Sequence, residues 1–185
     1  MGLPIRRLVL ATNENNVLDE FFKTGRYRPR LSQETRQTSS PSMDISKASN
    51  FERYMFDLLE RDPEQTRHLW RQIDEQGYFD LAADSRWQSQ GERFALFSGS
   101  SNHALRIETI REVYREFGEI IDPHTADGFA VAKSFADPGV PMICLETAQP
   151  AKFAQTIMEA LGIPPPVPAG YENLESKAQR FCRMP

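Results

Sequence analysis

Four polar stretches in the sequence have residue types that can bind a ligand or take part in catalysis. They stand beside or after short apolar runs typical of β-strands: Thr12–Asn13, Ser98–Asn102, His124–Thr125 and Thr147. In open α/β sheets, ligands bind beyond the carboxyl ends of the strands, so these stretches are candidates for the rim of a site. Because every parallel α/β protein has such a rim, position alone does not define the chemistry.

One of these stretches, and a separate group of arginines, point to a phosphate ligand. Ser98–Ser101 precedes a predicted helix, where free N–H groups and the helix dipole favour an anion. The stretch has neither G-x-x-x-x-G-K-[ST] nor G-x-G-x-x-G, which favours an ordinary capped turn. Arg26, Arg28 and Arg30 alternate around Tyr27 in a pattern that can grip a phosphorylated ligand. A solvated charged face is the more ordinary explanation.

The remaining candidates concern proton transfer, nucleophilic attack and metal binding. His124 is a possible general base, but no Ser or Cys in a nucleophile-elbow context accompanies it, which favours a histidine bonded within its own turn. Cys144 lies inside an apolar run and is predicted to be a small core residue. His68, His103 and His124 are scattered, so no metal site is expected. Thr147 is the first polar side chain after a predicted buried strand, where its hydroxyl can bond a bound ring.

The elements that position these residues alternate between strand and helix. Short apolar runs predict strands at 8–11, 94–97 and 140–146, the first of them buried on both faces. Helical spacing with caps predicts helices at 17–24, 50–59, 63–76, 102–117 and 151–161, and a short helix follows the Asp122–Gly128 stretch and ends at about 135. This rhythm predicts an α/β fold, a parallel sheet flanked by helices.

Three further expectations concern packing and loops. In the helix at 102–117, an inward stripe is expected from Leu105, Ile110, Val113, Tyr114 and Phe117. The aperiodic stretch 26–49 is long for a loop in a compact domain, so it is either functional or mobile. The residues after 162, with three consecutive prolines, are expected to form an extended tail.

Composition excludes several classes of function. The chain has 185 residues, with 22 Lys and Arg against 26 Asp and Glu, so no basic excess indicates a nucleic-acid partner. Two cysteines make no disulfide framework. No apolar stretch approaches the roughly 20 residues of a membrane span, and no signal peptide is evident. A cytoplasmic protein is therefore expected.

Three stretches resemble threonine synthase of the bacterial and yeast-like branch, in matching order and spacing. They are Met1–Asn15, Ser40–Arg53, and Asp122–Gly128 together with Glu146–Phe153. The family uses pyridoxal 5'-phosphate (PLP) in a type II fold to convert O-phosphohomoserine and water to L-threonine and phosphate, as a carbon–oxygen lyase. The Ser40–Arg53 stretch resembles threonine synthase rather than serine or threonine dehydratases, which share the cofactor.

The resemblance assigns a cofactor-binding role to Thr147. It lies in a stretch similar to the family's T-A-x-P-A-K-F motif, whose threonine contacts the pyridine nitrogen of PLP. A neutral hydroxyl does not enforce a protonated pyridine and so tempers the electron withdrawal of the ring. Many relatives have histidine where this chain has Gln149. Lys152 lies in the same motif but does not correspond to the family's Schiff-base lysine.

The family's Schiff-base lysine and its Gly-Asn-Phe-Gly phosphate loop have no counterpart in these 185 residues. The chain is therefore expected to be a C-terminal portion of the enzyme, incomplete without an N-terminal half, with no catalytic residue and no activity of its own. We expect residues 1–162 to be the C-terminal part of the PLP-binding α/β domain, with a helical insert at about 50–77, and 163–185 to be the tail. The alternative is a non-catalytic α/β subunit or regulatory relic that complements a separate N-terminal piece.

Overall fold

A parallel pair of strands lies at the centre of the fold. The computed structural model describes residues 4–183, so the first three residues of the Met1–Asn15 stretch and the last two of the predicted tail lie outside the described residues. Strands β1 (Leu8–Thr12) and β4 (Leu96–Ser100) run parallel, with Leu8 opposite Leu96. The α/β prediction, with parallel strands flanked by helices, is confirmed.

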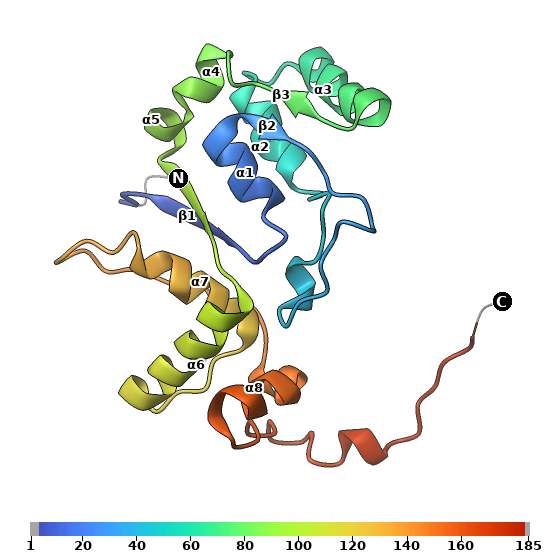
Figure 1. Ribbon diagram of the computed structural model, residues 1–185, viewed down its shortest axis with the longest axis vertical. Coiled ribbons are helices and arrows are strands. Elements are labelled where there is room, and N and C mark those ends of the chain that lie inside the picture. Colours follow the sequence, from blue (N-terminus) through green and yellow to red (C-terminus); the bar gives the residue numbers. More distant parts are fainter. Residues whose placement is uncertain (1–3, 184–185) are drawn as a thin grey trace.

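Helices cover both faces of this strand pair. In Figure 1, α1 (Val17–Thr24) lies on one side and α7 (Pro123–Lys133) on the other. On the α1 side, the Ser98 hydroxyl donates to Asp19 Oδ1 at 2.7 Å. On the α7 side, a Cβ built on Gly99 would lie 2.7 Å from Val131 Cγ1. Glycine at this position therefore allows α7 to approach β4.

Strand β4 begins two residues later than the predicted strand at 94–97. Residues 90–94 form a short helix, α5 (Gln90–Phe94), and Ala95 after it has a φ of 49°, in the left-handed region. The chain is extended only from Leu96 onward, so Ser98 and its neighbours belong to the strand. The predicted turn at 98–101 is wrong for this reason.

An aromatic core fills the space beside α1. Phe21, fully buried, meets the rings of Phe51 and Phe79 edge to face, with centroids 5.0 and 6.0 Å apart. We call this cluster the aromatic core; its buried members include Phe21, Phe22, Tyr27, Phe51, Met55, Leu58 and Phe79. They come from α1, α2 (Phe51–Leu58), α3 (Pro63–Gln76) and the antiparallel strands β2 (Arg26–Tyr27) and β3 (Phe79–Asp80).

Start and stop signals in the sequence locate these helices correctly. Asp62 accepts hydrogen bonds from the N–H groups of Glu64 and Gln65 and so begins α3, and Gly77 ends it with a φ of 85°. Gly25 ends α1 in the same way, with a φ of 82°. The helices predicted at 17–24, 50–59 and 63–76 are confirmed, and the last two lie in the expected helical insert.

A second core lies on the α7 side. Helix α6 (His103–Phe117) packs against α7 and α8 (Ala154–Leu161) through a buried cluster that includes Ile107, Ile110, Ala126 and Ile157. The predicted inward stripe is correct for Ile110 and Val113. It is wrong for Leu105, Tyr114 and Phe117, which are exposed, because α6 turns the Arg106–Ile107 side toward its neighbours.

Residues 140–146 are extended but form no strand. We call them the edge segment. Within the described residues, no backbone hydrogen bond joins this segment to a strand. Ile143 is 80% exposed and Leu145 is 76% exposed. The predicted strand is wrong because no neighbouring strand of residues 4–183 lies beside it. β1 is also less buried than predicted, since Leu8 is 49% exposed and β4 is its one partner within these residues.

The remaining elements are short. They are α4 (Ser85–Gln88) and the 3-10 turns η1 (Pro41–Met43), η2 (Pro150–Phe153) and η3 (Leu174–Ser176). The predicted helix at 151–161 is confirmed from Ala154 onward, its first turn being η2. Beyond Gly162 the chain is mostly exposed and extends away from the helices (Figure 1), as predicted for the tail. No helix within residues 4–183 is long and apolar enough to cross a membrane.

Candidate functional site

Two buried asparagines after β1 fasten the long loop at 26–49. Asn13 Nδ2 donates to Thr38 Oγ1 and to Asp44 Oδ1, each at 2.9 Å. Asn15 Nδ2 donates to the same Asp44 oxygen and to the Arg36 carbonyl, each at 2.8 Å. The loop is therefore ordered by side chains from the end of β1. Asn13 is fully buried and acts as an anchor; it does not cap α1, and it lines neither of the two cavities described below.

His124, in the first turn of α7, binds the 3-10 turn η1 of this loop. Its Nδ1 lies 2.7 Å from Asp122 Oδ1, and its Nε2 accepts from the Ser42 N–H at 3.0 Å. An accepting Nε2 is unprotonated, so Nδ1 carries the proton and donates to Asp122. Both ring nitrogens are thus occupied. The interpretation of His124 as a histidine bonded within its own turn is confirmed for Nδ1, whereas Nε2 bonds Ser42 of the distant loop.

Asp122 organises the N-terminus of α7. Its carboxylate accepts from the N–H groups of His124 and Thr125 and also bonds the Thr125 hydroxyl. Burial acts to raise the pKa of Asp122, but the hydrogen bonds from His124 and Thr125 outweigh it and hold the pKa below its usual range. Asp122 is therefore a carboxylate that fixes both neighbours.

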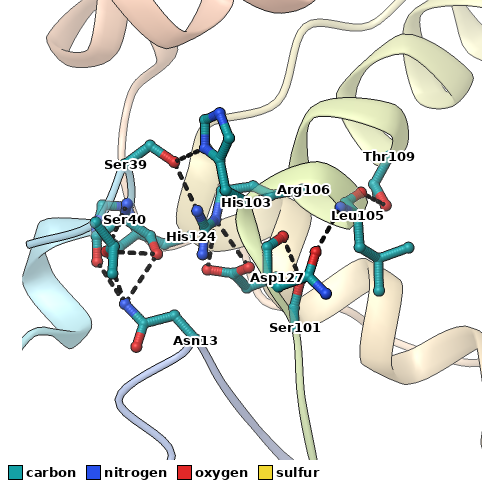
Figure 2. Close-up of polar contacts among 12 residues, drawn as sticks. Asn13, Ser39, Ser40, Ser101, His103, Leu105, Arg106, Thr109, His124 and Asp127 are labelled. Atoms are coloured by element: carbon teal, nitrogen blue, oxygen red, sulfur yellow. Dashed lines mark hydrogen bonds and ion pairs between the residues drawn. The ribbon is translucent and has the colours of Figure 1, made fainter. Parts of the chain in front are cut away.

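A buried arginine that the sequence reasoning missed joins the two sides of the molecule. Arg106, with no exposed surface, bonds both carboxylate oxygens of Asp127, at 2.9 and 3.0 Å. It also bonds Glu14 at 2.7 Å. Figure 2 shows its bond to Ser39, at 2.6 Å. Arg106 lies on one stripe of α6 with Ile110 and Val113. That helical spacing was the signal that could have identified it as buried.

The two carboxylates beside Arg106 respond differently to it. Burial raises the pKa of Asp127, although the Arg106 charge pulls it down. Burial also acts to raise the pKa of Glu14, but the hydrogen bond from Arg106 and backbone N–H donors leave it lowered. Arg106 thus offsets the charge of the fully buried Asp127 and ties it to Glu14, just beyond β1.

Thr147 lies at the end of the edge segment, beside Asp122 and Thr125. Its N–H donates to Thr125 Oγ1 at 3.3 Å, so the Asp122 carboxylate positions Thr147 through one intermediate hydroxyl. Thr147 is exposed, and its own hydroxyl makes no hydrogen bond to residues 4–183. It lines a cavity of about 680 Å³, as do Met43, His124 and Gly128.

The neighbours of Thr147 differ in exposure. Cys144 is half-buried, with Sγ 3.9 Å from the Thr125 carbonyl. Burial and the nearby Asp122 charge raise the pKa of the Cys144 thiol, which agrees with a packing residue rather than a nucleophile. Gln149 and Lys152 are both exposed. Gln149 precedes η2 and Lys152 lies within it, where the Lys152 N–H donates to the Gln149 carbonyl at 3.1 Å.

Only two of the three arginines predicted to bind a phosphorylated ligand share a cavity: Arg28 and Arg30 line it, and Arg26 is not among its lining residues. Arg26 lies over the Tyr78 ring, 4.0 Å from its centroid. Arg28 pairs with Glu34 at 2.9 Å, and Arg30 pairs with Glu20. Arg28 and Arg30 line a polar cavity of about 480 Å³, as does the Ser100–Asn102 stretch. Each of the three arginines already has a partner within the chain, as expected of a solvated charged face.

No group of three or more His, Cys, Asp or Glu residues in the described chain is arranged to hold a metal ion. His68 bonds Gln72 on α3, whereas His103 contacts Ser39 and Glu159. Neither lies beside His124. Thr147 combines a hydroxyl without a partner among residues 4–183, a cavity that it lines and a backbone fixed by Thr125.

Comparison with known proteins points to a single family. Residues 125–185 match the family model "Threonine synthase, C-terminal". Over 98% of its length the chain is 57% identical to threonine synthase of Methylobacillus glycogenes, and over its whole length 53% identical to that of Corynebacterium glutamicum. It spans 38% and 39% of those proteins.

Solved structures agree. PLP-bound threonine synthase from Brucella melitensis superimposes with a TM-score of 0.89 at 36% identity, covering 98% of this chain and 38% of that one. Threonine synthase from yeast superimposes with a TM-score of 0.79 at 31% identity, covering 97% of this chain and 37% of that one. In sequence and in fold, this chain is similar to the C-terminal part of threonine synthases.

Proposed function

We propose that this chain supplies the Thr147 side of the cofactor site of a threonine synthase. The complete enzyme would convert O-phosphohomoserine and water to L-threonine and phosphate, as a PLP-dependent carbon–oxygen lyase. The observation that carries the proposal is Thr147 itself. Its hydroxyl is free of partners among the described residues, its backbone is fixed by Thr125, and it lines the 680 Å³ cavity. The similarity to a PLP-bound threonine synthase supports the same assignment.

The residues around Thr147 fit the pyridine end of such a cofactor. When bound, PLP acts as an electron sink that stabilises negative charge on the substrate. Thr147 would bond the ring nitrogen through a neutral hydroxyl, which leaves the nitrogen without an enforced positive charge. Asp122 and Thr125 would orient Thr147, and His124 would hold the Ser42 turn at the cavity. These roles are binding and positioning.

We further propose that these 185 residues alone do not catalyse the reaction. An imine to the cofactor requires a lysine in the cavity, and no lysine of the described residues lines it. Lys23, Lys47 and Lys133 pair with Asp19, Asp74 and Glu112. Lys152 and Lys177 are exposed on η2 and the tail. The Schiff-base lysine would come from the part of the enzyme that this chain does not span. A cytoplasmic location belongs to the same proposal, since both cysteines are free thiols.

The test mixes the chain with the preceding part of the Methylobacillus glycogenes threonine synthase, PLP and O-phosphohomoserine. We expect phosphate release from the mixture and none from either piece. Thr147→Ala should shift the absorbance of the bound cofactor and lower phosphate release at least about tenfold, whereas Thr147→Ser should retain most of both. Thr66→Ala, on α3, is the matched control. A cofactor spectrum and a rate unchanged in Thr147→Ala would overturn the assignment. Association without phosphate release would favour the non-catalytic alternative.

A further inference from the structure

The open side of β1 and the edge segment face the same cavity. The cavity walls include Val9 and Ala11 of β1 on one side and residues 140–145 on the other. Its floor includes two small residues of α7, Gly128 and Ala132. This places an apolar slot between a strand with one partner and an extended segment with none, as far as residues 4–183 extend.

Both walls of the slot carry unpaired backbone groups. The Leu8 N–H donates to the Ala95 carbonyl and the Thr12 carbonyl accepts from the Ser101 N–H, so even-numbered residues of β1 direct their backbone toward β4. In a parallel strand the intervening residues, Val9 and Ala11, direct theirs to the opposite edge. In the edge segment, the N–H groups from Met142 to Glu146 donate no hydrogen bond within the described chain. Such rows of free groups are templates for a strand.

The two walls also run in the same direction. β1 begins beside residue 137, since Arg7 pairs with Asp137 at 3.1 Å, and the edge segment begins at the same place, where the Val140 N–H donates to the Asp137 carbonyl. At the other end, Thr147 meets Thr125 on the first turn of α7. β1 ends near that turn, since Asn13 bonds Ser40 and the neighbouring Ser42 N–H donates to His124.

We propose that the slot receives a parallel β-strand from the part of a threonine synthase that this chain does not span. The inference rests on the proposed function. One inserted strand would pair with β1 on one side and with the edge segment on the other, which makes a continuous sheet of four strands with β4 at one end. Its side chains would be apolar, because Leu8 on β1 and Ile143 and Leu145 on the edge segment are apolar and exposed.

The amount of polypeptide available supports this occupant. The chain spans 38% of its Methylobacillus glycogenes relative, so about three fifths of that protein lies outside the matched region. A small molecule could fill the volume, but it could not pair the backbone groups of both walls. The carboxyl end of the inserted strand would lie beside Thr147, so the loop after it would reach the cofactor site.

Amide hydrogen exchange tests the inference in the chain alone and bound to the preceding part of the Methylobacillus glycogenes enzyme. We expect the amides of Val9 and Ala11 and every second amide from Met142 to Glu146 to exchange freely in the chain and to slow on the order of 100-fold in the complex. Phosphate release is measured on the same samples. Protection without phosphate release would leave the slot assignment standing and overturn the proposed function. Phosphate release without protection at these amides would support the proposed function and overturn the slot assignment.

Variants sharpen the test. Because Ile143 and Leu145 are exposed, Ile143→Asp with Leu145→Asp should leave the folding of the chain unchanged and weaken association on the order of 100-fold. The matched control is Leu31→Asp with Leu174→Asp, at positions 69% and 54% exposed, which should leave association unchanged. Equal effects of the two pairs would overturn the inference. Concentration-dependent protection in the chain alone would also overturn it, by assigning the slot to a second copy. In one continuous chain that joins the two parts, protection of the same amides supports the inference and free exchange there overturns it.

Discussion

The aromatic core and the slot beside β1 differ in how far this chain satisfies its own packing. Phe21, Met55, Leu58 and Phe79 have no exposed surface, and their rings and side chains come from elements of this chain alone. At the slot, by contrast, Ile143 and Leu145 remain exposed and the backbone of the edge segment is unpaired within the described residues. The first region is closed by local elements, whereas the second requires a partner.

The closed region contributes most of the packing that stabilises the fold, whereas the open region carries the candidate site. Closed packing around α1, α2 and α3 supports the strand pair from one side. The open region carries Thr147 and the cavity, and it rests on polar anchors at the first turn of α7. Substitutions should therefore have large effects on folding in the aromatic core and at the anchors, and small effects at the slot.

The largest effect is expected at Arg106, which joins α6 to α7, to the loop at 26–49 and to the end of β1. Arg106→Ala would leave Asp127 buried without its counter-charge and Glu14 without its partner, which should lower the free energy of unfolding by about 3–5 kcal/mol. Urea denaturation followed by circular dichroism measures it. The control, Arg67→Ala on the exposed face of α3, should change stability little. A loss below about 1 kcal/mol would show that the contacts of Arg106 with Asp127 and Glu14 contribute little to stability.

Met55→Ala tests the closed region directly. Met55 is fully buried in the aromatic core, so its truncation should leave a cavity and lower the free energy of unfolding by about 2–5 kcal/mol. Met158→Ala, on α8 and 45% exposed, is the matched control and should have a much smaller effect. The comparison of the two regions fails if both methionines respond alike in urea denaturation.

These regions also differ in how well the sequence predicts them. Helices with a capping residue and a terminal glycine, such as 63–76 after Asp62, follow from local signals and lie where expected. The strand at 140–146 does not form because an apolar run specifies burial in a sheet, and no strand of residues 4–183 lies beside it. β4 is displaced because Ala95 adopts a left-handed conformation that no local pattern indicates.

The candidate site was predictable only in part. Thr147 was located by its position after an apolar run and by its resemblance to a family motif, and its cofactor role stays a prediction. The Asp122–Thr125–Thr147 chain of contacts depends on the fold bringing residues 22 apart together. Arg106 lay on a stripe that also held Ile110 and Val113. A charged residue there is buried only because Glu14, Ser39 and Asp127 come from distant segments.

Gly99→Ala probes the contact between β4 and α7. The added Cβ would lie 2.7 Å from Val131 Cγ1, so the Val131 side chain or α7 must shift, and the free energy of unfolding should fall by about 1–3 kcal/mol. Combining it with Val131→Ala should recover part of this loss, because the smaller side chain makes room. Gly91→Ala in α5 meets no neighbouring atom and is the control. Absence of rescue in a thermal or urea melt would argue against this close approach.

Asp122→Ala probes the anchor of the open region and its dependence on pH. Loss of the helix cap and of the His124 bond should lower stability by about 1–2 kcal/mol at pH 7. Because the folded-state pKa of Asp122 lies below its usual value, its contribution is present above about pH 4 and is lost as the pH falls further. Denaturation curves between pH 7 and pH 2 should therefore converge for the variant and the parent. Curves that stay parallel would contradict this sign.

The smallest effect is expected at the slot. Ile143→Ala should change the free energy of unfolding of this chain by less than about 0.5 kcal/mol, because the side chain is 80% exposed and packs on little. The fully buried Ile157→Ala, in the second core, should cost about 2–5 kcal/mol and is the matched contrast. In the complex with the preceding part of a threonine synthase, Ile143→Ala should begin to destabilise, because the inserted strand would bury it. An Ile143 effect as large in the free chain as in the complex would mean that the edge segment is already packed, and the contrast between a closed and an open region would then be wrong.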